Sequence, residues 1–147
     1  MTDAHLVAKL LAKLETYVRE LQTLSRPEKI ESDVREERFV EHTLQLAIQV
    51  ALDVASHIVS DDRLGEPRTN RELFEILARH GWITDELHQV LRQVVGFRNV
   101  LVHGYSSVDL EIVRKIVQTD LDDLLDFAGA VRARLSEHQA QAGESSG

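Results

Sequence analysis

Apolar residues that recur at intervals of three and four positions constrain the fold of this chain more than any other feature. Between about residues 4 and 24 they are Leu6, Leu10, Leu14, Val18 and Leu21, and between about residues 34 and 60 they are Val40, Leu44, Ala47, Ala51, Val54 and Ile58. This spacing places them on one face of an α-helix. The 147 residues include only two Pro and seven Gly, and no stretch alternates apolar and polar residues as a half-buried strand does. The sequence therefore predicts an all-α protein.

Capping residues predict the limits of a short third helix and the start of a fourth. Thr69 and Glu72 have the spacing of a capping box, which opens a helix that reaches about Arg79. Gly81 follows and is expected to end that helix. Thr84 then stands where the N-cap of the fourth helix is needed.

The fourth helix is expected to reach about His103, and Ser106 or Ser107 to cap a long fifth helix. The apolar face of that fifth helix is Leu110, Val113, Val117, Leu121, Leu124, Ala128, Val131 and Leu135. Long helices with short connections favour an up-and-down bundle, here of four long helices plus one short helix. We expect one domain, residues 1–138, followed by a flexible C-terminal tail at residues 139–147, which are rich in Ala, Gln, Gly and Ser.

Composition excludes several kinds of site. The chain has no Cys, which excludes disulfides and zinc–thiolate sites. No apolar run approaches the roughly 18 residues of a membrane-spanning helix, and no signal peptide is evident, so we expect a cytoplasmic protein without a membrane partner. The formal net charge of −8 argues against broad, non-specific binding of nucleic acids. From Leu87 to Val108, however, there is no Asp or Glu, and this stretch contains Arg92 and Arg98.

The fourth helix carries more apolar surface than one core usually needs. One apolar stripe is Leu87, Val90, Val94, Phe97 and Leu101, and the adjacent one is Leu91, Val95 and Val102, interrupted by Arg98. A third, polar stripe consists of His88, Arg92, Gly96, Asn99 and His103. The helix is therefore either the centre of a monomeric bundle or faces a second copy of the chain with its second apolar stripe. We favour the second interpretation, a homodimer with this helix near the two-fold axis.

Four residues at the end of this helix have no evident role in packing: Arg98, Asn99, His103 and Tyr105. A guanidinium pairs well with phosphate oxygens, and a histidine at a helix C-terminus is favoured in its charged form, which suits proton transfer. This combination suits chemistry on a phosphodiester. Arg98 and His103 lie about 140° apart on a regular helix. They converge only if the helix ends near Val102 or if a second copy completes the site.

These four residues resemble the signature of the HEPN superfamily in its HepT-like form, Arg-x4-His-x-Tyr. Residues 42–53 and 96–103 are similar to the second helix and the catalytic helix of that family. The resemblance implies a homodimeric, metal-independent endoribonuclease with its site at the dimer interface, the toxin of a type VII toxin–antitoxin system. It also implies a partner, an MntA-like nucleotidyltransferase antitoxin, which silences the toxin by AMPylation of Tyr105.

RNA cleavage without a metal uses the 2′-OH as nucleophile, and it needs a base, an acid and stabilisation of the charged phosphorane. His103 suits the first two tasks and Arg98 the third, while Asn99 would orient His103 or the phosphate. Asp53 and Gln49 are candidates for a supporting layer behind the site, although an exposed polar face of the second helix is the simpler interpretation. The expected substrate is RNA and not DNA, and no metal or other cofactor is expected.

Two other functions stay open from the sequence. HEPN-type bundles also occur as non-catalytic partners of nucleotidyltransferases, and in such a protein Arg98 and His103 would bind a nucleotide or substrate without cleaving it. A plain helical adaptor, whose acidic surface binds a basic protein, is the other alternative.

Overall fold

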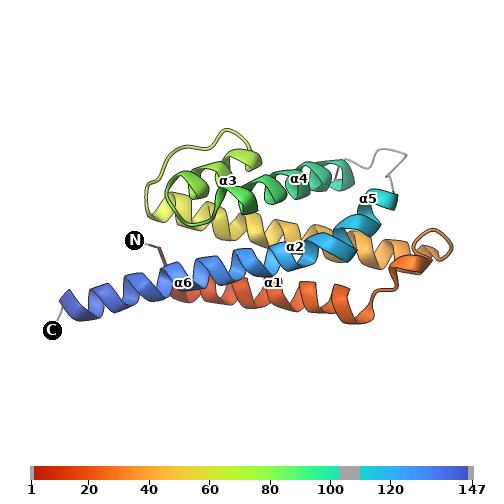
Figure 1. Ribbon diagram of the computed structural model, residues 1–147, viewed down its shortest axis with the longest axis horizontal. Helices are drawn as coiled ribbons and strands as arrows, with labels where there is room; N and C mark the ends of the chain where they lie inside the picture. The colour runs from red at the N-terminus through yellow and green to blue at the C-terminus, as the bar shows by residue number, and fades with distance from the viewer. Residues whose placement is uncertain (1, 103–109, 146–147) are drawn as a thin grey trace.

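The computed structural model describes the backbone of residues 2–102 and 110–145, and their side chains except those of residues 99–102 and 138–145. The regular structure of this part is helical (Figure 1). The helices are α1 (Ala4–Leu24), η1 (Pro27–Lys29), α2 (Val34–Asp61), α3 (Asn70–Arg79), α4 (Asp85–Val102), α5 (Leu110–Lys115), the π-helical turn η2 (Ile116–Asp120) and α6 (Leu121–Ser145). The prediction of an all-α protein is confirmed.

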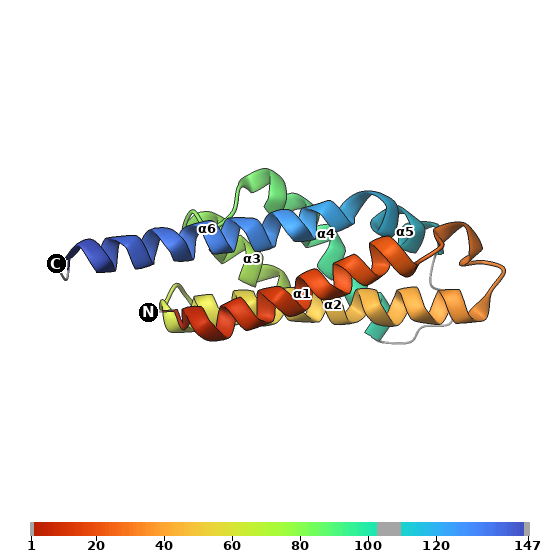
Figure 2. The ribbon, with the colours of Figure 1, turned by 90° about the horizontal axis from the view of Figure 1, so that it is seen from below.

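The long helices run up and down along one common direction. Helices α1, α2 and α6 lie side by side over the length of the molecule, and α3 and α4 form a shorter antiparallel pair against α2 (Figures 1 and 2). Helix α4 also contacts α6 and runs antiparallel to α2. The C-terminal end of α4 therefore lies at the end of the bundle where α1 ends, α2 begins and α5 is found (Figure 1).

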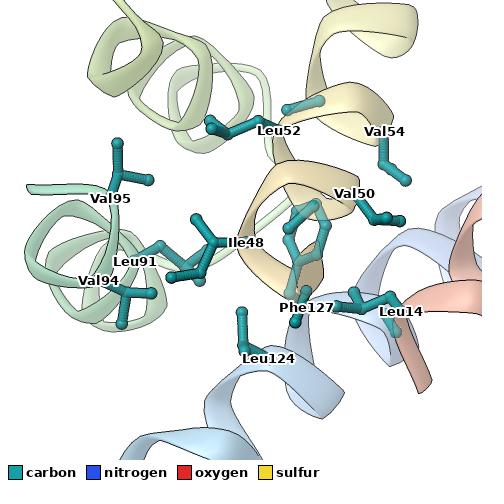
Figure 3. Packing of buried hydrophobic residues seen from close by; sticks show 14 of the residues in the cluster. Leu14, Ile48, Val50, Leu52, Val54, Leu91, Val94, Val95, Leu124 and Phe127 are labelled. Carbon is teal, nitrogen blue, oxygen red and sulfur yellow. The ribbon is translucent and has the colours of Figure 1, made fainter. Parts of the chain in front are cut away.

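The apolar faces predicted from the sequence form the core, and both stripes of α4 contribute to it. Figure 3 shows Leu91 of α4 pointing toward Ile48 of α2, with Leu124 of α6 nearby. Leu91 and Val95 are each only 1% exposed within the single chain. These two members of the second apolar stripe are thus buried within one chain, and the inference of a dimer from Leu91 and Val95 is wrong. The side chain of Val102, the third member of that stripe, lies outside the described residues.

The predicted capping residues act as expected at α3 and α4. The side chain of Thr69 accepts a hydrogen bond from the backbone N–H of Glu72 at 3.3 Å, and Thr84 accepts one from Leu87 at 3.1 Å. Glu72 departs from a regular capping box because its carboxylate accepts from the backbone N–H of Arg68. Gly81 ends α3 with φ of +80°, a left-handed conformation that glycine adopts without steric cost.

The last part of the chain differs from the single long helix that the sequence predicts. The π-helical turn η2 stands between α5 and α6, and α6 continues to Ser145. The helix therefore extends into residues 139–147, which were expected to form a tail, because Ala and Gln are good helix formers. The boundary at residue 138 stays a prediction. The candidate caps Ser106 and Ser107 lie outside the described residues.

Helix α2 is long and apolar enough to cross a membrane by length and composition alone, with a mean hydropathy of 1.2 over its most apolar stretch. The expectation that no run of this kind exists was therefore wrong. Because 61% of that stretch is buried inside the bundle, α2 has the surroundings of a core helix.

Candidate active site

Arg98 lies near the end of α4, on the same helix face as Leu91 and Val95. Because that face packs against α2, the Arg98 side chain is directed to α2 and is only half-exposed. There its Nη2 donates a hydrogen bond to Oε1 of Gln49. The residue that interrupts the second apolar stripe in the sequence thus has a polar partner on the neighbouring helix.

Gln49 is in turn held by Asp53, one turn further along α2. Gln49 Nε2 donates to Oδ1 of Asp53 at 2.9 Å, and both side chains are half-buried. Gln49 and Asp53 are therefore linked to Arg98 by hydrogen bonds, whereas the sequence favoured an exposed polar face of α2; their part as a supporting layer stays a prediction. An amide stands between the guanidinium and the carboxylate. This arrangement fixes the direction of Arg98 without the close ion pair that would neutralise its charge.

The protein does not satisfy Arg98 completely. Its Nε atom is buried and has no hydrogen-bond partner in the described part of the chain. An unsatisfied buried donor typically costs about 1–3 kcal/mol of stability. Because this nitrogen is buried, an anion could reach Arg98 only through the rest of its half-exposed side chain.

The other predicted site residues lie outside the described side chains. The backbone of Asn99 belongs to α4, but its side chain is not among those described, and His103 and Tyr105 both fall in residues 103–109. The structure therefore places Arg98, Gln49 and Asp53 together. The roles of all six residues stay predictions.

Glu41 of α2 is a feature that sequence reasoning missed. It precedes Gln49 by two helical turns, and its Oε1 atom is buried without a hydrogen-bond partner among the described residues. Burial raises the pKa of Glu41, and the negative charge of Glu37 adds to that rise. No sequence signal marks this residue, because a glutamate on an amphipathic helix is normally solvated.

A hollow of about 610 Å³, lined by described residues, lies at the opposite half of α4, against α6. Its floor is apolar, including Trp82 and Leu87, and its rim carries Glu86, Asp123 and Asp126. Burial and the neighbouring aspartates raise the pKa of Asp123. Because these carboxylates repel phosphate, this hollow does not suit an RNA strand. The described residues contain no group of three His, Asp or Glu side chains placed to hold a metal ion.

Comparison with known proteins decides the family. Residues 9–131 match the ribonuclease HepT-like family. The chain belongs to that family. The mRNA nuclease HepT of Shewanella oneidensis is 37% identical over 90 residues, which are 61% of this chain and 68% of that protein. The tRNA nuclease HepT of Aphanizomenon flos-aquae is 34% identical over 102 residues, 66% of this chain and 69% of that protein.

Comparison with solved structures supports the same family assignment. The tri-AMPylated Shewanella oneidensis HEPN toxin in complex with an MNT antitoxin superimposes with a TM-score of 0.82 at 29% identity, covering 90% of this chain and 99% of that one. The HEPN resemblance, the helical fold and the class of enzyme, a ribonuclease, are thereby confirmed. The chain is a HepT-like ribonuclease of the toxin–antitoxin type.

Proposed function

We propose that this HepT-like chain is a metal-independent endoribonuclease whose catalytic residues are Arg98 and His103, with Asn99 as an orienting residue. The hydrogen-bonded series Arg98–Gln49–Asp53 carries the proposal. It fixes a guanidinium on the helix that bears the family motif, and the amide partner leaves the positive charge available. A transition state with extra charge on phosphate oxygens gains from such a preoriented cation.

The proposed reaction follows from the chemistry of RNA. The 2′-oxygen forms a bond to the adjacent phosphorus and gives its proton to a base, and the bond from phosphorus to the 5′-oxygen breaks as that oxygen receives a proton. The products are a 2′,3′-cyclic phosphate and a 5′-hydroxyl end. His103, or a pair of His103 residues from two copies, acts as base and acid, and Arg98 stabilises the phosphorane.

We also propose that the enzyme is a homodimer with a composite site. This proposal rests on exposed apolar side chains and not on the second stripe of α4. In the described part of the chain, the large apolar side chains that remain exposed are Leu24, Val34 and Ile112. They belong to the end of α1, the start of α2 and α5, which meet at the end of the bundle where α4 finishes (Figure 1). Arg114 of α5 fixes this arrangement by donating to the carbonyl oxygen of Pro27 and pairing with Glu31.

The proposed partner is a cognate nucleotidyltransferase antitoxin of the MntA type. The Shewanella toxin is tri-AMPylated and in complex with an MNT antitoxin, and this chain carries a tyrosine, Tyr105, two positions after the motif histidine. AMPylation of Tyr105 would add a phosphate that competes with RNA for Arg98. RNA and such an antitoxin as partners suit a cytoplasmic enzyme.

The test is incubation of purified, unmodified protein with RNA, with and without EDTA. We expect fragments that end in 2′,3′-cyclic phosphate and 5′-hydroxyl groups and an unchanged rate in EDTA. Arg98→Ala and His103→Ala should each lower the rate by about 10²–10⁴, whereas Arg79→Ala, an exposed arginine on α3 paired with Glu75, should not. Cleavage that requires a divalent metal contradicts the mechanism. Nucleotide binding without cleavage supports the non-catalytic alternative.

A further inference from the structure

Arg71, at the start of α3, lies across α4 at Gly96. A methyl group at Gly96 would stand 2.7 Å from Nη2 of Arg71 and 3.6 Å from its Cζ. The guanidinium therefore occupies the space that any other residue at position 96 would fill with its own side chain. This approach depends on the packing of α3 against α4, which Figure 1 shows side by side.

Arg92, one turn before Gly96, lines the same hollow as Arg71. Arg71, Gln89, Arg92 and Gln93 line a hollow of about 350 Å³ between the two helices, and no carboxylate is among these lining residues. Both arginines are exposed, and in the described part of the chain neither has an ion pair or a hydrogen bond. In a chain with a net charge of −8, two arginines that line one hollow and have no partner among the described residues make a local positive region that favours an anion.

This hollow, hereafter the α3–α4 hollow, lies on the polar stripe of α4 that leads toward the motif. Arg92, Gly96 and Asn99 follow at intervals of four and three along that stripe. Arg98 is on a different face, about 120° from Arg92 around a regular helix. The α3–α4 hollow is thus separate from Arg98 and Gln49 but continuous with the face that carries Asn99.

We propose that the α3–α4 hollow binds a backbone phosphate of the RNA strand other than the one that is cleaved. This inference rests on the proposed function, because it assigns a second phosphate contact to the same substrate. The two guanidinium groups supply charge and directed donors for phosphate oxygens. The amides of Gln89 and Gln93 supply neutral hydrogen-bonding groups for the ribose or the bases. Binding at this position holds the strand along the polar stripe of α4.

Binding of a 2′-O-methyl oligoribonucleotide tests the proposal, because such a strand cannot be cleaved by its own 2′-hydroxyl groups. Fluorescence anisotropy would be measured from low to high salt for the parent, Arg71→Gln, Arg92→Gln and the control Arg79→Gln. The control removes the same charge from α3 but away from the hollow. We expect Arg71→Gln and Arg92→Gln to weaken binding about two- to fivefold each. Each should lower the slope of log affinity against log salt by about 0.7, the value for one phosphate contact of a single strand.

Gly96→Ala provides a second test that does not remove any charge. The new methyl group displaces the flexible end of Arg71, and alanine favours the helix, so Tm should stay or rise. We expect Gly96→Ala to weaken binding as Arg71→Gln does and to have no further effect when combined with it. Loss of binding through misfolding would instead lower Tm.

The outcomes separate this inference from the proposed function. If the parent cleaves RNA and Arg71→Gln binds the oligonucleotide like Arg79→Gln, the α3–α4 hollow is not a phosphate site and the proposed function stands. A parent that binds only free phosphate or nucleotide, and not the oligonucleotide, also overturns the inference. A parent that neither cleaves nor binds RNA overturns both.

Discussion

The side chain that accepts a hydrogen bond from Arg98 determines how much of the arginine's positive charge remains available to a substrate. A carboxylate at position 49 would form a direct ion pair and would compete with phosphate, whereas the Gln49 amide orients the guanidinium and stays neutral. Asp53 acts one step further away and holds the amide. This arrangement makes Gln49 a positioning residue in the proposed mechanism.

Gln49→Glu should therefore lower cleavage while the fold is maintained. The added carboxylate pairs with Arg98 and cancels its charge, so we expect kcat to fall about ten- to a hundredfold, less than the roughly 10²–10³ that is lost when a transition-state donor is removed outright. The control is Gln45→Glu, which adds the same charge one turn away on α2. Circular dichroism and single-turnover kinetics would be measured together. Equal effects of the two substitutions on kcat would mean that charge near α2, and not the contact with Arg98, matters.

Glu41 is expected to reduce stability at neutral pH. Its pKa is raised by burial and by Glu37, so the folded chain binds the proton more tightly than the unfolded chain, and stability falls as pH rises through the raised pKa. Glu41→Gln removes this charge and should raise Tm at pH 7. The gain should shrink as the pH falls toward about 3, below the ordinary glutamate pKa of about 4.3, where the carboxyl is protonated in both states. A gain of equal size at both pH values would show that charge is not the cause.

Which polar side chains meet could not be predicted from the sequence. Spacing places Asp53, Gln49 and Arg98 on two helices, but Arg98 and Gln49 are 49 positions apart, and their contact depends on how α4 is rotated against α2. The contact of Arg71 with Gly96 could not be predicted either, because it depends on how α3 packs against α4. The motif itself was recognisable because its four residues are local in sequence.

Among the elements, the limits of the helices followed closely from the sequence. Periodic apolar residues, Thr69, Thr84 and Gly81 act locally, so α1, α2, α3 and the start of α4 are found where they were expected. The sequence did not predict the π-helical turn. The turn changes the helical register, but the apolar residues before and after it still face the core, so their spacing does not reveal it. The width of the apolar arc on α4 was also misread, since a helix packed against α2, α3 and α6 buries more than one stripe.

Leu91 tests this placement of α4. Because Leu91 packs against α2 inside one chain, Leu91→Ala should lower the free energy of unfolding by about 2–5 kcal/mol, the usual cost of a cavity in a core. Gln93→Ala, an exposed substitution two positions away, should change it by no more than about 0.5 kcal/mol. Urea unfolding at one protein concentration would compare them. A small effect of Leu91→Ala would place this side chain at a surface between copies instead.

At the scale of the whole molecule, the large apolar side chains that remain exposed in the described part of the chain lie at one end of the bundle. Leu24, Val34 and Ile112 are 63%, 60% and 45% exposed, and they belong to elements that meet where α4 ends (Figure 1). The proposed dimer therefore uses this end of the bundle, which would bring the C-terminal ends of α4 from two copies toward each other. The α3–α4 hollow also lies beside α4, so one strand of RNA along this helix would reach both the hollow and the end of the bundle.

Ile112→Asp should weaken this dimer and cleavage together. A charge at a buried apolar contact costs enough to raise the dimer Kd by about tenfold or more, and a site completed by two copies loses activity as the monomer accumulates. The control is Ala8→Asp, an exposed position of α1 near its other end, which adds the same charge far from the contact. Light scattering and RNA cleavage would be followed over a dilution series. In the parent, activity should fall with the dimer on dilution, and Ile112→Asp should move both curves to higher concentration. A parent that is monomeric at micromolar concentration contradicts the composite site. So does cleavage activity per chain that stays constant while the dimer dissociates on dilution.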